Sequence, residues 1–160
     1  MKAFIKTIGI LTSGGDAPGL NAAIRAICIS AKEKYGAKVL GFKNGYRGLI
    51  ENNFVKMSDF DMEALLSMSG TCLGTSREKP FKATEKNAVT GKMPVESIKE
   101  TFKKNKLDVL FCLGGNGTNT TASLLAKEGL PVIGLPKTID NDIYGTEVTF
   151  GFHSAIDVAS

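Results

Sequence analysis

The fold is decided by the stretch Leu107-Asp108-Val109-Leu110-Phe111-Cys112-Leu113-Gly114-Gly115-Asn116-Gly117-Thr118. Leu107 to Leu113 is an apolar run of the length of a buried strand, and the glycines after it mark a tight turn. Thr118 to Glu128 carries a helical pattern that ends at Gly129, a residue suited to a helix C-terminus. The next apolar run, Leu130 to Leu135, predicts a second strand. A strand, a helix and a strand in succession indicate two parallel strands joined by a crossover helix.

The same alternation precedes this unit along the chain. We expect further strands and helices at these positions: strands over Ile5 to Leu11, Lys38 to Phe42 and Phe54 to Met57, and helices over Leu20 to Lys34, Asp59 to Met68, Val95 to Lys104 and Phe152 to Ser160. Asp16 is the candidate N-cap of the first helix, and Asn44 to Gly48 is expected to be a loop. Ser69 to Pro94 has little periodicity, and long irregular segments in compact domains usually serve function. The pattern predicts an α/β fold, namely a Rossmann-like, three-layer parallel sheet with helices on both faces.

Composition narrows the class of protein. The chain has 160 residues, which suits one domain or part of a larger protein, and its net charge of +4 suits small anions. That charge is too dispersed to predict nucleic-acid binding, and no stretch is apolar for the length of a membrane span. The three cysteines are far apart and odd in number, which predicts free thiols in a reducing compartment. We therefore expect a soluble, cytoplasmic protein that binds neither nucleic acid nor membrane.

Three loops are expected at one edge of the sheet, because ligands of such sheets bind beyond the carboxyl ends of the strands. They are Gly14 to Gly19, Gly114 to Gly117 and Pro136 to Asp142. In the first, Gly14 and Gly15 precede a helix and turn backbone N–H groups toward a bound anion, although a tight turn alone would need the same residues. The convergence of the three loops is stronger evidence than any one of them.

The second loop and the irregular segment add candidate phosphate ligands. Gly115, Asn116, Gly117 and Thr118 repeat the strand–turn–helix arrangement, and Gly117 leaves room for a flat ring or a phosphate beside the backbone. The alternative is that these residues only connect a strand to a helix and bind no ligand. Arg77 lies in a segment rich in Gly, Thr and Ser, where a guanidinium can hold phosphate oxygens, although most surface arginines have no such role.

The third loop carries the acids. In an extended segment Thr138, Asp140 and Asp142 point to one side, roughly 6.5 Å apart in succession. Asp140 can accept a hydroxyl proton, Thr138 can orient the acceptor, and Asp142 can bind the acceptor or help to hold Mg²⁺. The acids could instead cap a turn, since Asn-Asp pairs are common in turns. With Lys137 beside them, they predict a site for phosphoryl transfer.

Taken together, the motifs resemble the phosphofructokinase family. The resemblance rests on residues 14–25, 70–77, 114–118 and 136–142, and it continues through Gly145-Thr146 and residues 150–155. It implies transfer of a phosphoryl group from a nucleotide to the 1-hydroxyl of fructose 6-phosphate, with Mg²⁺ and a homo-oligomer, commonly a tetramer. It also implies site residues: Gly15, Arg77 and Gly115 to Thr118 at the donor, Tyr46 lining the donor site, Asp140 as the base, and Thr138 and Asp142 as sugar-phosphate and metal neighbours.

Two departures from the family pattern concern the metal and the donor. Asn116 stands where family members usually carry an Asp that helps to hold Mg²⁺, and an amide oxygen is a weaker ligand. Lys137 is typical of pyrophosphate-dependent members, but those members usually have Asp where this chain has Gly117. Because no side chain blocks position 117, we expect ATP as the donor, with pyrophosphate as the alternative.

Two further departures concern regulation and extent. Arg25 matches an effector-binding arginine of regulated bacterial members, but Ile29 stands where another is expected, which argues against effector control of that kind. Family members are much longer, so residues 1–160 are expected to form the donor-binding domain with the catalytic loop. The second, sugar-phosphate domain would be absent from this chain, and the segment would not turn over alone. A relative of NAD kinases or lipid kinases and a non-catalytic nucleotide-binding module remain as alternatives.

Overall fold

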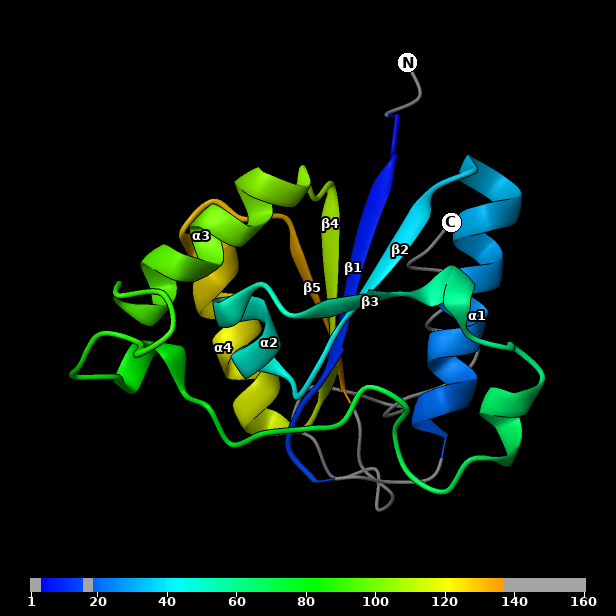
Figure 1. Ribbon diagram of the computed structural model, residues 1–160, viewed down its shortest axis with the longest axis horizontal. Coiled ribbons are helices and arrows are strands. Elements are labelled where there is room, and N and C mark those ends of the chain that lie inside the picture. Colours follow the sequence, from blue (N-terminus) through cyan, green and yellow to red (C-terminus); the bar gives the residue numbers. More distant parts are fainter. Residues whose placement is uncertain (1–3, 16–18, 137–160) are drawn as a thin grey trace.

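The computed structural model describes residues 4–15 and 19–136. Within them, one five-stranded sheet has the strand order β3-β2-β1-β4-β5 (Figure 1). The strands are β1 (Thr7–Thr12), β2 (Lys38–Phe42), β3 (Phe54–Lys56), β4 (Val109–Gly114) and β5 (Val132–Pro136). The helices are α1 (Leu20–Tyr35), α2 (Tyr46–Glu51), α3 (Pro94–Asn105) and α4 (Asn116–Lys127), with 3-10 turns at Met57–Asp59, Ala64–Ser67 and Pro80–Lys82.

The sheet is mixed, so the expectation of a wholly parallel sheet is wrong at one edge. β1 pairs in parallel with β2 and with β4, and β4 pairs in parallel with β5. β3 is antiparallel to β2, with Phe42 opposite Phe54. A parallel partner would need a crossover that returns the chain along the whole length of β2. The six-residue helix α2 is too short to do so, and the chain therefore turns back from the carboxyl end of β2.

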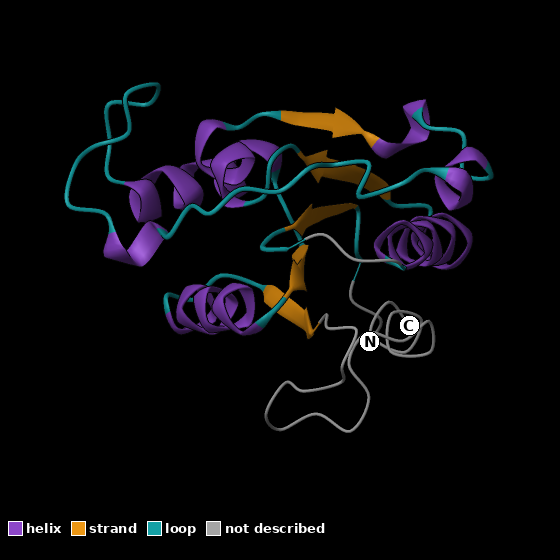
Figure 2. Cartoon of the chain, turned by 90° about the horizontal axis from the view of Figure 1, so that it is seen from below, coloured by secondary structure: helices purple, strands orange, loops and turns teal. Residues whose placement is uncertain are grey.

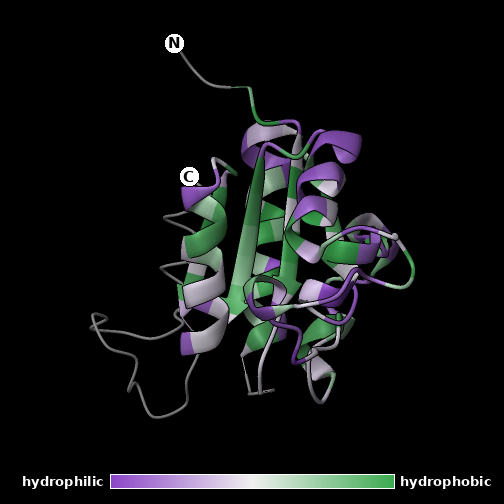
Figure 3. Ribbon diagram, turned by 90° about the vertical axis from the view of Figure 1, so that its left-hand side faces the viewer, coloured by the Kyte–Doolittle hydropathy of each residue, from purple (hydrophilic) through white to green (hydrophobic). Residues whose placement is uncertain are grey.

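Helices cover both faces of the sheet, as expected. Figure 2 shows the strands between α1 on one side and α2, α3 and α4 on the other. Side chains alternate between the two faces along each strand: on β1, Ile8 and Ile10 belong to the α1 side of the core, and Leu11 belongs to the other. Burial on both faces explains why the strands are nearly continuous apolar runs. Figure 3 shows the same distribution, with apolar strands at the centre and polar residues on the outer sides of the helices.

Several expected elements differ from those of the structure. The loop predicted at Asn44 to Gly48 is largely the helix α2, which buries Leu49 and Ile50 despite the glycine at position 48. The helix predicted over Asp59 to Met68 is replaced by the 3-10 turns at Met57–Asp59 and Ala64–Ser67. Here tertiary packing overrides local propensity.

The ends of helices and strands also shift by a few residues. α4 begins at Asn116, two residues before the predicted start, and β1 begins at Thr7 rather than Ile5. The N-cap of α1 is Gly19, with φ 96°, rather than Asp16, which lies outside the described residues. The helix predicted from Phe152 to Ser160 also lies outside them.

Candidate functional site

Two glycine turns meet at the carboxyl ends of β1 and β4. The backbone N–H of Ser13 donates a hydrogen bond to Leu113 O at 3.0 Å, which joins the chain after β1 to β4. A Cβ added at Gly114 would lie 2.6 Å from Ser13 O and would collide with Thr118 Oγ1. A Cβ at Gly14 would lie 3.7 Å from the same hydroxyl. The two turns are therefore in contact, and only glycine at position 114 allows them to approach so closely.

The first turn presents exposed backbone to solvent. Gly14 and Gly15 are both exposed, and Gly14 has a φ of 80°, in the left-handed region that favours glycine. After the turn the chain enters α1, whose first residue is Leu20. Exposed backbone close to the beginning of a helix suits an anion, as the sequence predicted.

The second turn leads directly into α4 and leaves the beginning of that helix open. Asn116 and Gly117 are exposed, no side chain caps the helix, and its first turn contains no acid. A Cβ at Gly117 would meet no atom within 4 Å. The N–H groups of a helix N-terminus carry partial positive charge. The arrangement therefore fits a phosphate group, and it leaves space beside position 117 for a larger ligand.

Tyr46 supports this turn from inside the protein. Its side chain is 1% exposed, and its hydroxyl donates a hydrogen bond to Thr118 O at 2.8 Å. Burial raises the pKa of the phenol, with the neighbouring Cys112 as a further cause, so the hydroxyl stays protonated and able to donate. We expected Tyr46 to line the donor site; the structure places it beneath the first turn of α4, where it holds the backbone in place.

The segment that carries Arg77 is hydrogen-bonded to the end of β1. Thr12 Oγ1 donates to Gly74 O at 2.8 Å and lies 2.8 Å from Thr71 Oγ1. The hydroxyl of Ser13 donates to Ser76 O at 3.4 Å. Arg77 itself is exposed and has no hydrogen-bond or ion-pair partner within residues 4–15 and 19–136. A cation free of such partners is thus held on a segment that runs beside the glycine turns.

The apolar core holds this segment from below. Leu73 is fully buried and lies over Gly41 of β2, where a Cβ would come within 2.5 Å of Leu73 Cδ2 and 2.6 Å of Met57 Sδ. The absence of a side chain at Gly41 therefore lets Leu73 rest directly on the sheet. The backbone N–H of Asn44 also donates to Leu73 O at 2.8 Å.

The structure brings together one part of the predicted site. Gly14, Gly15 and the residues from Gly115 to Thr118 meet at one edge, with Arg77 on the neighbouring segment. The acidic loop (Lys137, Thr138, Asp140 and Asp142) lies outside the described residues. Asn116 is exposed, and among the residues that the structure describes no group of His, Cys, Asp and Glu side chains could hold a metal ion.

Sequence reasoning missed the residues that hold the Arg77 segment. Thr12, Ser13 and Asn21 are polar but buried, with exposed fractions of 0%, 6% and 7%. A buried polar side chain needs a hydrogen-bond partner, and in these three the partner is the segment from Gly70 to Ser76. Two features of the sequence could have identified these residues: a Thr and a Ser at the end of an apolar strand, and an Asn on the apolar side of a helix.

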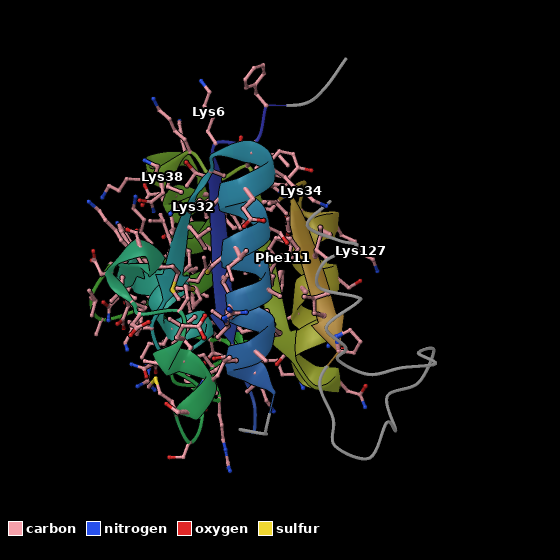
Figure 4. The ribbon with its side chains drawn as sticks, turned by 90° about the vertical axis from the view of Figure 1, so that its right-hand side faces the viewer. Lys6, Lys32, Lys34, Lys38, Phe111 and Lys127 are labelled. Atoms are coloured by element: carbon pink, nitrogen blue, oxygen red, sulfur yellow. The ribbon has the colours of Figure 1, made fainter. Side chains whose placement is uncertain are left out.

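Lys6, Lys38 and a large cavity lie away from the glycine turns. Figure 4 shows Lys6 and Lys38 toward the end of the molecule where β1 begins, opposite the glycine turns. A cavity of about 960 Å³ opens between the second half of α1, β2 and Met57, with Lys32 and Lys38 among its lining residues. No described helix combines the length and the apolar character needed to cross a membrane.

An α/β domain with glycine turns at the carboxyl ends of neighbouring parallel strands has an architecture that is typical of phosphate- and nucleotide-binding proteins. Comparison with known proteins narrows this class. The model of the family described as Phosphofructokinase matches residues 7–160, and the chain belongs to this family.

Curated relatives share this segment at high identity. The chain is 57% identical over 157 residues to an ATP-dependent 6-phosphofructokinase of Spirochaeta thermophila, covering 97% of this chain and 43% of the relative. It is 46% identical over 154 residues to ATP-dependent 6-phosphofructokinase 3 of Bacteroides thetaiotaomicron, covering 96% of this chain and 45% of the relative. The chain therefore spans less than half the length of these relatives.

Solved structures share the fold. Phosphofructokinase of Pichia pastoris in the T-state superposes with a TM-score of 0.77 at 34% identity, over 96% of this chain and 17% of that one. A pyrophosphate-dependent phosphofructokinase of Marinobacter aquaeolei superposes with a TM-score of 0.74 at 26% identity, over 92% of this chain and 37% of that one.

Proposed function

We propose that this chain is the donor-binding part of an ATP-dependent 6-phosphofructokinase. The reaction transfers the terminal phosphoryl group of ATP to the 1-hydroxyl of fructose 6-phosphate. The observation that carries the proposal is the contact between the two glycine turns at the ends of β1 and β4, beside the uncapped beginning of α4. The names of the similar curated relatives support ATP as the donor.

The geometry supports the following roles at the donor site. The N–H groups of Gly14, Gly15 and Gly115 to Thr118 would bind donor phosphate oxygens, because exposed backbone at helix beginnings favours anions. Arg77 would neutralise charge on the transferring group, as an arginine does in phosphoryl transfer. The open space at Gly117 would take the nucleotide. Lys137 keeps pyrophosphate as the alternative donor, and a pyrophosphate-dependent structure of the family has the same fold.

The catalytic roles stay predictions from the sequence. Asp140 would accept the proton of the sugar hydroxyl, Thr138 would orient that hydroxyl, and Asp142 would bind the acceptor or the metal. Mg²⁺ would neutralise charge on the donor phosphates, with Asn116 and Asp142 as its protein ligands. The exposed amide of Asn116 can offer one neutral oxygen ligand, which suits a metal held mainly by the phosphates and water.

The rest of the proposal concerns the whole protein. We infer a second domain that binds the sugar phosphate, a homo-oligomer and a cytoplasmic location, and we expect residues 1–160 alone to be inactive. A non-catalytic nucleotide-binding module is the second candidate, and the replacement of a charged metal ligand by Asn116 favours it.

The test is a donor comparison in the full-length protein that contains this segment. Phosphorylation of fructose 6-phosphate is measured with ATP and with pyrophosphate at equal concentration, with and without Mg²⁺. We expect turnover with ATP and a loss of at least about 10³-fold in kcat for Asp140→Asn, with nearly unchanged ATP binding. A loss of under about tenfold would remove Asp140 from its role as the base. Nucleotide binding without any transfer would favour the non-catalytic module.

A further inference from the structure

Asn21 connects the start of α1 to the segment that carries Arg77. Its Nδ2 donates a hydrogen bond to Gly70 O at 2.6 Å, and its Oδ1 accepts one from the backbone N–H of Cys72 at 2.8 Å. The residue is 7% exposed, and the bond to Cys72 is buried, whereas the bond to the exposed Gly70 is partly buried. A single amide therefore fixes two backbone groups about fifty residues away in the sequence.

Only one type of side chain can make both contacts from this position. An Asn amide offers a donor and an acceptor in one plane, whereas an ionised Asp offers acceptors alone and Gln is longer by one methylene. The backbone that it holds needs such support, because Gly70 and Gly74 have φ values of 84° and 76° and so add conformational freedom to the segment.

The contact joins two parts of the proposed donor site. Asn21 is the second residue of α1, close behind the first glycine turn, and the segment that it holds continues to Arg77. Thr12 and Ser13 hold the same segment further along, at Gly74 O and Ser76 O. A change at Asn21 would therefore alter where the guanidinium lies relative to the glycine turns.

We propose that Asn21 is a positioning residue that sets Arg77 against the phosphate-binding turn after β1. This proposal rests on the proposed function, because it takes Arg77 as a ligand of the donor phosphates. Asn21 touches neither donor nor acceptor in this role. Its effect passes through the backbone of residues 70–72.

The kinetic test uses the full-length protein. In Asn21→Ala we expect kcat/KM for ATP to fall roughly ten- to a hundredfold, because small misplacements of a binding group are costly. The KM for fructose 6-phosphate should stay within about twofold, because Arg77 is proposed to bind the donor and not the sugar phosphate. The isosteric Asn21→Asp keeps the acceptor for Cys72 but loses the donor to Gly70, and it should show a similar loss. If Asn21→Ala does not fold, Asn21→Asp takes its place in this kinetic test.

A double-mutant cycle separates positioning from general stability. In an Arg77→Ala background, Asn21→Ala should change the ATP kinetics by no more than about twofold, because the group that it positions is gone. The matched control is Asn105→Ala, which removes an amide bonded to Asn52 Oδ1 at 2.7 Å and Thr101 O at 3.0 Å, away from the site. That variant should lower thermal stability without changing ATP kinetics. Additive effects of Asn21→Ala and Arg77→Ala would overturn the proposal.

Amide hydrogen exchange tests the contact without needing activity. In Asn21→Ala, which removes the acceptor for Cys72, the Cys72 amide should exchange faster, while the amides of β1 and β4 keep their protection. Asn21→Asp keeps that acceptor and is the matched control, in which Cys72 should stay protected. Unchanged protection at Cys72 in Asn21→Ala would overturn the proposal. If the wild-type protein transfers no phosphoryl group but Cys72 loses protection in Asn21→Ala, the proposed function fails and the contact between Asn21 and the segment stands.

Discussion

Gly117 offers a sharp test of the donor site, because the structure predicts opposite effects on stability and on activity. The residue is exposed, its φ lies outside the left-handed region, and an added Cβ would meet no protein atom within 4 Å. The folded protein can therefore accept Ala, Asn or Asp at this position without strain. Any loss of activity in these variants would have to come from the ligand.

The effect on stability follows from the position in α4. Replacing a helical glycine by alanine stabilises by about 0.5–1 kcal/mol, through the freedom that the unfolded chain loses. An Asp in the first turn adds about 0.3–1 kcal/mol by interacting with the helix dipole. For a chain of this size, each kcal/mol raises Tm by about 2–4 °C. We expect Gly117→Asp to melt at the wild-type temperature or a few degrees above it.

The effect on ATP use has the opposite sign. A carboxylate about 4 Å from a phosphate charge costs about 4 kcal/mol at the effective dielectric constant of a protein surface. If half of this penalty is relieved by movement and solvent, about 2 kcal/mol remains. We therefore expect kcat/KM for ATP to fall by roughly 30- to 1000-fold in Gly117→Asp. Gly117→Asn has nearly the same shape as Gly117→Asp without the charge, and Gly117→Ala adds only one methyl group. The loss of kcat/KM for ATP should therefore be largest for Asp, smaller for Asn and smallest for Ala.

The assay measures ATP-dependent phosphorylation of fructose 6-phosphate in the full-length protein, alongside thermal unfolding of each variant. Pyrophosphate is tested in parallel, because a side chain at position 117 should affect the smaller donor less. If Gly117→Asp retains wild-type kcat/KM for ATP, the donor does not lie against α4 at this position. If the Tm of Gly117→Asp is several degrees below that of the wild type, the folded protein does not have open space for a side chain at position 117.

Two further predictions concern the residues beneath the site. Tyr46→Phe removes the buried hydrogen bond to Thr118 O and should cost about 1–2 kcal/mol in urea unfolding. It should also raise the KM for ATP but not that for fructose 6-phosphate, and an unchanged KM for ATP would remove its supporting role. Burial raises the pKa of the Cys112 thiol from 9.0 to about 12, so the unfolded chain loses this proton at a lower pH than the folded protein. Stability should thus decrease from about pH 9 upward, by about 1.4 kcal/mol at pH 10 from this thiol. The decrease in urea midpoint between pH 8 and pH 10 should be smaller in Cys112→Ala, and equal decreases would contradict the prediction.

Local patterns predicted the order of the elements and the place of the glycine turns. The apolar runs at β1, β2, β4 and β5 are long enough to be recognised as buried strands, and glycines follow β1 and β4 where the backbone must turn sharply. Because parallel strands bring their carboxyl ends to one edge, the sequence pattern alone predicted that both turns lie at that edge. The pairing of β1 with β4 in the structure is what brings them into contact.

Other features depended on contacts between distant residues. The direction of β3 is set by the short path through α2, and the helix α2 forms because Tyr46, Leu49 and Ile50 find a buried surface. No local pattern shows that surface in advance. The burial of Tyr46 is of the same kind, since its partner Thr118 is 72 residues away.

The amino-acid sequence by itself thus determined the α/β class, the glycine turns and the family motifs, because strand and helix periodicity and glycine conformations are local properties. Only the tertiary structure decided that the Arg77 segment lies along the end of β1, through Thr12, and the start of α1, through Asn21, and that the space at Gly117 is open. Those facts arise from hydrogen bonds and packing between segments far apart in the chain, where a buried polar side chain takes whichever backbone group the fold brings to it.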